Sequence, residues 1–305
     1  MIKSAPSFLA GTEWPYGKYH CVVEFAPRWC TMQPWVISAI AAWALAHRAN
    51  DGTISVENGS SANWAWRMGL ANYLGVDAGA PLTAHEEAGK FIPLRTLHTG
   101  SDIALLLSDV ASLLHLGTAE TNAILTVISE MARNVLEHSE SPHGAVASAQ
   151  LYRGRRTRRT YVSIGIADSG VGIRKTINRN YKDVHSHRDA VLKAMEFGAS
   201  GAVRGTYGSP DNAGAGLAIS RQTSQASGGY FAVISGSAIF RNSLAKQPAP
   251  DSQLVHDIGF YPGTAICAEI EVGAAADLSA VLQVVSQSMG SPEFADDASE
   301  LVRFS

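Results

Sequence analysis

The segment ISEMARNVLEHSES, residues 128–141, decides the fold that this sequence predicts. A helix over residues 119–138 is expected, because apolar residues recur there with helical spacing at Ile124, Leu125, Ile128, Met131 and Val135. Glu130 and Asn134 are separated by four residues on this helix, so both side chains project from one face, with His138 one turn further. The helix therefore presents a carboxylate and an amide side by side.

That pair suits the chemistry of a phosphate site. An amide oxygen such as that of Asn134 is a neutral, hard ligand for Mg²⁺, which keeps several waters and takes phosphate oxygens as its other ligands. A carboxylate such as Glu130 can orient or deprotonate an attacking water or hydroxyl. The alternative is that both residues face solvent on an ordinary amphipathic helix.

A second segment, IADSGVGI at residues 166–173, places an acid at the end of an apolar strand. Burying the Asp168 carboxylate there is costly without a partner. It could accept a hydrogen bond from an exocyclic amine, which distinguishes an adenine amino group from a keto group. Gly170 and Gly172 let the backbone turn tightly and approach a flat ring. The alternative is a strand followed by a D-S-G turn.

A third segment, NAGAGLAIS at residues 212–220, opens a helix expected over residues 215–226. Gly214 and Gly216 lie at its start, where free backbone amides attract phosphate. Most such glycine pairs merely form turns, so the pair gains meaning only beside the other two segments.

Together and in this order, the three segments resemble the N box and two glycine boxes of the GHKL (Bergerat-fold) superfamily, over about residues 118–272. The resemblance implies an α/β sandwich, made of a mixed sheet and a helical layer, that binds ATP and Mg²⁺. It implies that Asn134 is a ligand of Mg²⁺ and that Asp168 binds the adenine amine. The other residues implied to contact the nucleotide are Gly170, Gly172 and Ile173 at the base, Gly214, Gly216 and Leu217 at the phosphates, and Thr264, which supports the adenine through a water.

Glu130 indicates the branch of the superfamily. It matches the general-base position of the ATPases and anti-sigma-factor serine kinases, and the run SEMARNVLEH is similar to the form found in those kinases. We therefore expect hydrolysis of ATP or transfer of its γ-phosphate to a protein serine or threonine. The alternatives are an ATP-gated protein-interaction module and an atypical histidine kinase, although none of the candidate acceptors His47, His85 and His98 has an H-E-x-x-x-P setting.

The long polar stretch that ends at Asn212 is expected to act as a lid, with one helix over residues 188–197. Its candidate contacts to the γ-phosphate are Lys175, Arg179, Lys182 and Arg204. His185 and His187 lie too close together, without a clear third ligand, to indicate a metal site, and are interpreted as lid surface or phosphate contacts.

We expect three parts: a small α/β module over residues 1–117, the ATP-binding domain over 118–290, and a tail over 291–305. The first alternates strands at 20–25 and 53–56 with helices at 32–49 and 62–74, and is loosely similar to STAS modules. Ser60 and Ser61 could accept phosphate, although a helix N-cap is the simpler interpretation. A helix at 102–116 ends at Gly117. Beyond it we expect strands at 144–152, 160–167, 229–235, 237–241 and 264–271, and a helix at 278–289.

Composition excludes several classes of function. A net charge of -3 gives no global reason to expect binding to nucleic acid or an anionic membrane. Cys21, Cys30 and Cys267 lack the spacing of a disulfide framework or a zinc site, and no apolar run has the length of a membrane span. We expect a cytoplasmic protein with a protein partner, and possible homodimerisation. The arginine-rich turn 153–159 either contacts nucleic acid or an acidic partner, or is a solvated hairpin tip.

Overall fold

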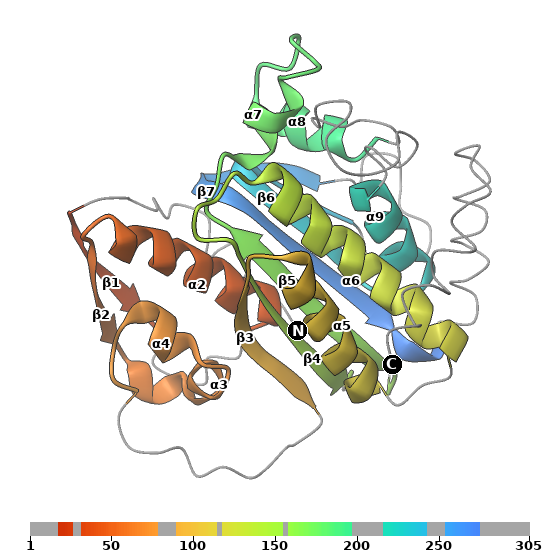
Figure 1. The fold of residues 1–305 in the computed structure, drawn as a ribbon, viewed down its shortest axis with the longest axis horizontal. Helices are drawn as coiled ribbons and strands as arrows, with labels where there is room; N and C mark the ends of the chain where they lie inside the picture. Colours follow the sequence, from red (N-terminus) through yellow and green to blue (C-terminus); the bar gives the residue numbers. More distant parts are fainter. Residues whose placement is uncertain are drawn as a thin grey trace.

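The structure is a computed structural model that describes residues 18–26, 32–78, 90–114, 118–154, 158–196, 216–242 and 254–274. It is a mixed α/β protein built around a five-stranded antiparallel sheet (Figure 1). In spatial order the strands are β3 (Phe91–Leu97), β4 (Ala145–Arg153), β5 (Thr160–Asp168), β7 (Leu254–Glu271) and β6 (Phe231–Arg241). In the part of the chain described, no helix has both the length and the apolar character needed to cross a membrane.

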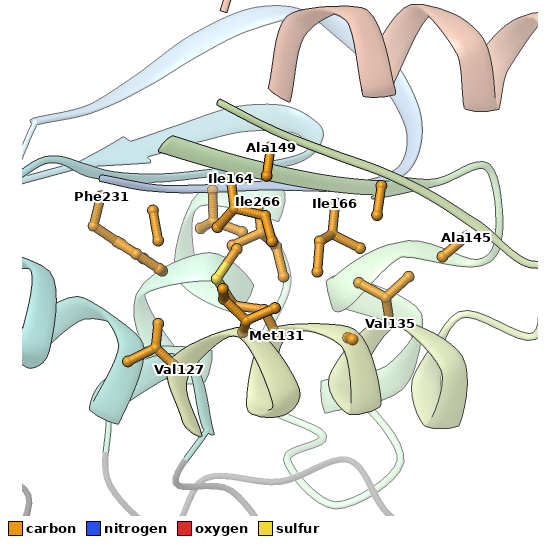
Figure 2. Close-up of a cluster of buried hydrophobic side chains, with 14 of the residues drawn as sticks. Val127, Met131, Val135, Ala145, Ala149, Ile164, Ile166, Phe231 and Ile266 are labelled. Atoms are coloured by element: carbon orange, nitrogen blue, oxygen red, sulfur yellow. The ribbon is translucent and has the colours of Figure 1, made fainter. Parts of the chain in front are cut away.

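One face of the sheet is covered by a helical layer that includes α6 (Thr118–His138) and α9 (Gly216–Ala226). Alternate strand residues such as Ile164, Ile166 and Ile266 point toward α6 and contact its apolar face at Val127, Met131 and Val135 (Figure 2). The same layer contains α5 (Gly100–Leu114), α7 (Gly172–Ile177) and α8 (His187–Ala194). Buried apolar residues recur with a period of two along the strands and of about 3.6 along α6. Apolar patterns in the sequence predicted these strands and this helix.

The other face of the sheet is covered by α2 (Pro34–Ala49), which packs on β4 and β5. The approach is very close, because a side chain at Gly165 would overlap the backbone of Trp35. A buried hydroxyl adds polar contacts, since Ser38 Oγ donates to the Gly165 carbonyl at 3.1 Å and lies 3.0 Å from Ser148 Oγ. Both faces of the sheet are therefore buried.

The remaining elements pack around α2. A parallel two-stranded sheet consists of β1 (His20–Glu24) and β2 (Thr53–Glu57). After the short helix η1 (Gly59–Ser61), the helix expected over residues 62–74 is instead two helices, α3 (Asn63–Arg67) and α4 (Leu70–Leu74). The break occurs because Gly69 adopts a φ of 87°, a left-handed conformation that ends the helix before it.

Ser60 and Ser61 lie in η1, so they do not form the expected helix N-cap. Ser61 Oγ donates to the carbonyls of Ala26 at 2.6 Å and of Asn58 at 2.9 Å. That hydroxyl therefore stabilises the turn between β2 and α3.

The expected division at Gly117 falls at residues 115–117, outside the described residues, but the sheet extends across it. β3, which precedes this point, pairs with β4, which follows it. α2 contributes to the core on the far face of that same sheet. A boundary at Gly117 would thus divide one sheet, because strand pairing joins segments that are distant in the sequence.

Other expectations correspond closely to the structure. The strands at 144–152 and 160–167 are β4 and β5, and the helices at 119–138 and 215–226 are α6 and α9. The two strands expected at 229–235 and 237–241 are one strand, β6, whose register with β7 shifts around Gly236. The helix α7 was not expected. The helix at 278–289 and the tail at 291–305 lie outside the described residues.

Candidate functional site

A cavity lies between α6 and the sheet, and the sequence segments singled out above meet around it. Its lining residues come from α6, the end of β5, α7, the start of α9 and β7: Asn134, Val135, His138, Ser139, Asp168, Gly172, Ile173, Thr176, Ile177, Ala194, Gly216, Leu217, Thr264 and Ile266. Of the third segment, Gly214 lies outside the described residues, while Gly216 and Leu217 line the cavity. Predicted residues from four distant parts of the chain therefore converge here, although Glu130 and Gly170 are not among the lining residues.

Asp168 ends β5 with its side chain only 1% exposed. Its Oδ1 accepts a hydrogen bond from the Gly170 amide at 2.7 Å, and the Thr264 amide also donates to the carboxyl group. Its Oδ2 is buried and has no hydrogen-bond partner among the described residues. Burial raises the pKa of Asp168 to about 7, although the two amides favour the carboxylate. The cavity thus contains one strong acceptor atom that lacks a donor.

Glycines let the loop after β5 pass close to the end of α6. A Cβ at Gly170 would overlap the carbonyl oxygen of Ser139, and that carbonyl accepts the Val171 amide at 2.8 Å. Gly172 has a φ of 72°, and a Cβ there would lie 2.9 Å from Ser235 Oγ. The two glycines that the sequence marked are therefore required by close approach and by backbone conformation.

A hydrogen-bonded group from β6 and β7 supports this loop. Ser235 Oγ accepts the Ile173 amide at 2.8 Å and donates to the Gly263 carbonyl at 2.8 Å. Thr264 is the β7 partner of Asp168 in the sheet register, and its Oγ1 lies 3.4 Å from Ser235 Oγ. Sequence analysis missed Ser235, and no local motif marks it, because its role depends on strand pairing.

The first turn of α9 lies directly against the polar face of α6. A Cβ at Gly216 would overlap Asn134 Nδ2 and would lie 2.9 Å from Glu130 Oε2. Asn134 Nδ2 is buried and has no partner within the described residues. Burial raises the pKa of Glu130, and Glu137 raises it slightly further, whereas Arg133 lowers it. An unsatisfied amide and the start of α9 thus meet at the cavity, with the Glu130 carboxyl group beside Gly216.

The candidate lid cations have different positions. Lys175 and Arg179 both form ion pairs with Glu140, which follows α6. Lys182 is exposed, and Arg204 lies outside the described residues. His138 also lines the cavity, and its pKa is lowered by burial and by the nearby Arg179. In this conformation two of the four predicted phosphate contacts are therefore engaged elsewhere.

The histidines considered as acceptors or ligands are not part of this cavity. His47 is buried, with Nε2 3.1 Å from the Tyr19 carbonyl, His98 is exposed, and His85 is outside the described residues. His185 is exposed, and His187 Nδ1 lies 3.0 Å from Ser237 Oγ. Within the described residues, no group of three or more His, Cys, Asp or Glu side chains is placed to hold a metal.

At the arginine-rich turn, residues 155–157 lie outside the description. Of its described arginines, Arg153 donates from Nε to the Arg158 carbonyl at 2.9 Å. Arg159 forms a 2.7 Å ion pair with Glu271. These contacts hold the ends of the hairpin together. The turn lies at the end of the sheet away from Asp168, because Arg153 pairs with Thr160 at the opposite end of β5.

Comparison with known proteins identifies no relative: no family model, curated protein or solved structure matches the chain.

Proposed function

We propose that the cavity binds ATP with Mg²⁺ and that the protein hydrolyses ATP or transfers its γ-phosphate to a protein serine or threonine. The observation that carries this proposal is the free Oδ2 of Asp168, a buried acceptor in a cavity that is also lined by Asn134 and the start of α9, with Glu130 beside Gly216. A ligand that satisfies both ends needs a hydrogen-bond donor on a flat group and an anion beyond it. ATP has both.

At the base end, the adenine amino group would donate to Asp168 Oδ2. The apolar lining formed by Ile173, Ile177 and Ile266 would contact the faces of the ring. A guanine would present a keto oxygen instead, and two acceptors facing each other in a buried site cost at least one unmade hydrogen bond, about 1–3 kcal/mol. This difference favours ATP over GTP.

At the phosphate end, the residues present fit a hydrated Mg²⁺. The Asn134 amide has an unsatisfied polar atom toward Gly216, and a half-turn of its side-chain amide would place Oδ1 there instead. Asn134 and phosphate oxygens would then hold the ion, which neutralises phosphate charge when it is bound. The first amides of α9 would contact phosphate oxygens, with Leu217 beside them.

In this proposal Glu130 acts as the general base. Burial raises the pKa of this carboxyl group, which makes its carboxylate a stronger base than an exposed glutamate. It would orient the attacking water or hydroxyl and accept its proton. The rest of the rate enhancement would come from positioning and from charge stabilisation around the transferred group.

The resemblance to GHKL proteins supports this proposal and extends it to the fold. We propose a Bergerat-type arrangement for the helical layer over the sheet, with a STAS-like origin for the segment before β3 and a signalling protein as partner. A second candidate function is an ATP-gated interaction module with little turnover. It is favoured by the Glu140 ion pairs, which keep Lys175 and Arg179 from acting on phosphate in this conformation.

Phosphate tracing separates these possibilities. Purified protein is incubated with Mg²⁺ and γ-labelled ATP, alone and with candidate partner proteins, and label is measured in free phosphate and in protein. Glu130→Ala should lower turnover by about 100-fold or more, as expected for loss of a general base, with nucleotide affinity nearly unchanged. Glu137→Ala, an exposed change on the same helix, is the matched control. Unchanged turnover in Glu130→Ala refutes the base assignment, and absence of ATP binding by the unaltered protein refutes the proposal.

A further inference from the structure

A second cavity, of about 530 Å³, lies on the far side of the loop that follows Asp168. Its walls come from this loop, α7, the start of α8 and the parts of β6 and β7 around Gly236 and Gly263. Gly170 and Gly172 line this cavity, and Gly172 also lines the first one, so the two share a wall.

The rim of this second cavity is cationic. Arg174 and Lys175 lie on the exposed side of α7, and no acidic side chain is among the described lining residues. Lys175 Nζ is 3.6 Å from Glu140, whereas Arg174 forms no ion pair with any residue that the structure describes. An anionic group at the rim would therefore gain an uncompensated guanidinium as its partner.

The rim also has an apolar side. Phe260 is 49% exposed, one of four large hydrophobic side chains that are exposed among the described residues. Its ring lies 5.8 Å from the ring of His187 at an angle of 60°. The two rings form a surface that an aromatic or aliphatic side chain could cover.

The cavity also contains an unsatisfied acceptor. Asn178 Oδ1 is buried and has no hydrogen-bond partner among the residues described, although Asn178 lines the cavity. A buried acceptor without a donor is unfavourable by about 1–3 kcal/mol. A ligand that brings an N–H group to this atom would remove that penalty.

We propose that this second cavity is the docking site for an acidic segment of a partner protein that carries an aromatic or large apolar side chain. A carboxylate of the segment pairs with Arg174, its apolar side chain covers Phe260, and a backbone N–H donates to Asn178. A peptide supplies these three groups along one extended strand. Nucleic acid fits less well, because two rim cations in a protein with a net charge of -3 give little attraction for a polyanion.

The test uses the full-length protein without nucleotide, so its result does not depend on whether the first cavity binds ATP. The probe is a fluorescent peptide of glutamates around one central phenylalanine, and binding is followed by anisotropy at low and at physiological salt. Two control peptides replace the glutamates with glutamines or the phenylalanine with glycine. We expect saturable binding of the probe and at least about tenfold weaker binding of either control peptide, as for loss of an anchor contact.

Variants locate the binding. Arg174→Glu should weaken binding of the probe by at least about tenfold and Phe260→Ala by about fivefold, because both side chains are rim anchors. Arg153→Glu, at the arginine-rich turn, should change it by less than about twofold. All three are exposed positions, and circular dichroism checks that the fold is kept. No saturable binding, equal loss in Arg153→Glu, or tighter binding of a short DNA oligonucleotide that competes with the probe would each overturn the proposal.

Discussion

Replacing Asp168 by asparagine should make the folded protein more stable while removing nucleotide binding. Burial raises the pKa of this carboxyl group from the usual 3.8 to about 7, which corresponds to about 4 kcal/mol of penalty for the charged form in the folded state. The sign follows from linkage: below about pH 4 the group is protonated both folded and unfolded, and as pH rises toward 7 the unfolded chain loses its proton first. The carboxylate therefore destabilises the fold increasingly between these pH values. Asparagine has nearly the same shape and no such dependence.

The expected magnitude can be measured as a difference between the two proteins. Urea unfolding of the unaltered protein and of Asp168→Asn gives two stability curves, and other titrating groups such as Glu130 cancel in their difference. The free energy of unfolding of Asp168→Asn, relative to that of the unaltered protein, should rise by about 2.5 kcal/mol between about pH 5 and about pH 8. In calorimetry at about pH 8, ATP affinity should fall by about 100-fold, because a charge-assisted hydrogen bond is replaced by facing donors.

Two outcomes would refute this reasoning. A stability difference that stays constant between about pH 5 and about pH 8 would mean that the carboxyl group titrates normally and is not desolvated. Unchanged ATP affinity in Asp168→Asn would mean that Oδ2 does not bind the base. The first result concerns burial alone, and the second concerns the proposed function, so the two inferences can fail separately.

Two further predictions concern glycines. Gly165→Ala should lower the free energy of unfolding by about 3 kcal/mol, because its Cβ would overlap the Trp35 backbone. Gly100→Ala is the control and should be nearly neutral, because a Cβ there has open space. Chemical denaturation compares the two variants, and equal effects would contradict the packing of α2 on β5. Gly216→Ala should change stability little, because the atoms that its Cβ meets are the flexible ends of Asn134 and Glu130, yet lower ATP turnover at least about tenfold by displacing them. Normal turnover of Gly216→Ala, together with a crystal structure in which Asn134 and Glu130 keep their positions, would contradict this prediction.

The candidate site was predictable to the extent that its residues form local patterns. The helical period of α6 placed Glu130 and Asn134 on one face, and the strand pattern placed Asp168 at a strand end. Ser235 and the engagement of Lys175 by Glu140 were not predictable, because both depend on which distant segments become neighbours. A single serine in an apolar strand carries no signal of the loop that it will support.

In the fold, too, local patterns were predictable and contacts between distant segments were not. Elements with strong periodicity, such as α6 and β5, were predicted nearly to the residue, whereas the break at Gly69 was not, since a glycine within a helical pattern is often tolerated. The sequence did not predict that α2 packs on the sheet. α2 is apolar nearly all round, as is typical of a buried helix, but Gly165 and Ser148, which form the surface on which it lies, resemble ordinary strand residues.

The burial of both sheet faces makes α2 and β3 part of the same core as the first cavity. A fragment beginning at Thr118 would lose β3 and α2, and would expose the apolar face formed by residues such as Val146, Ile234 and Tyr261. Such a fragment should aggregate instead of folding independently. Because α2 packs directly on β5, a change that displaces α2 should also shift β5, the strand that ends in Asp168.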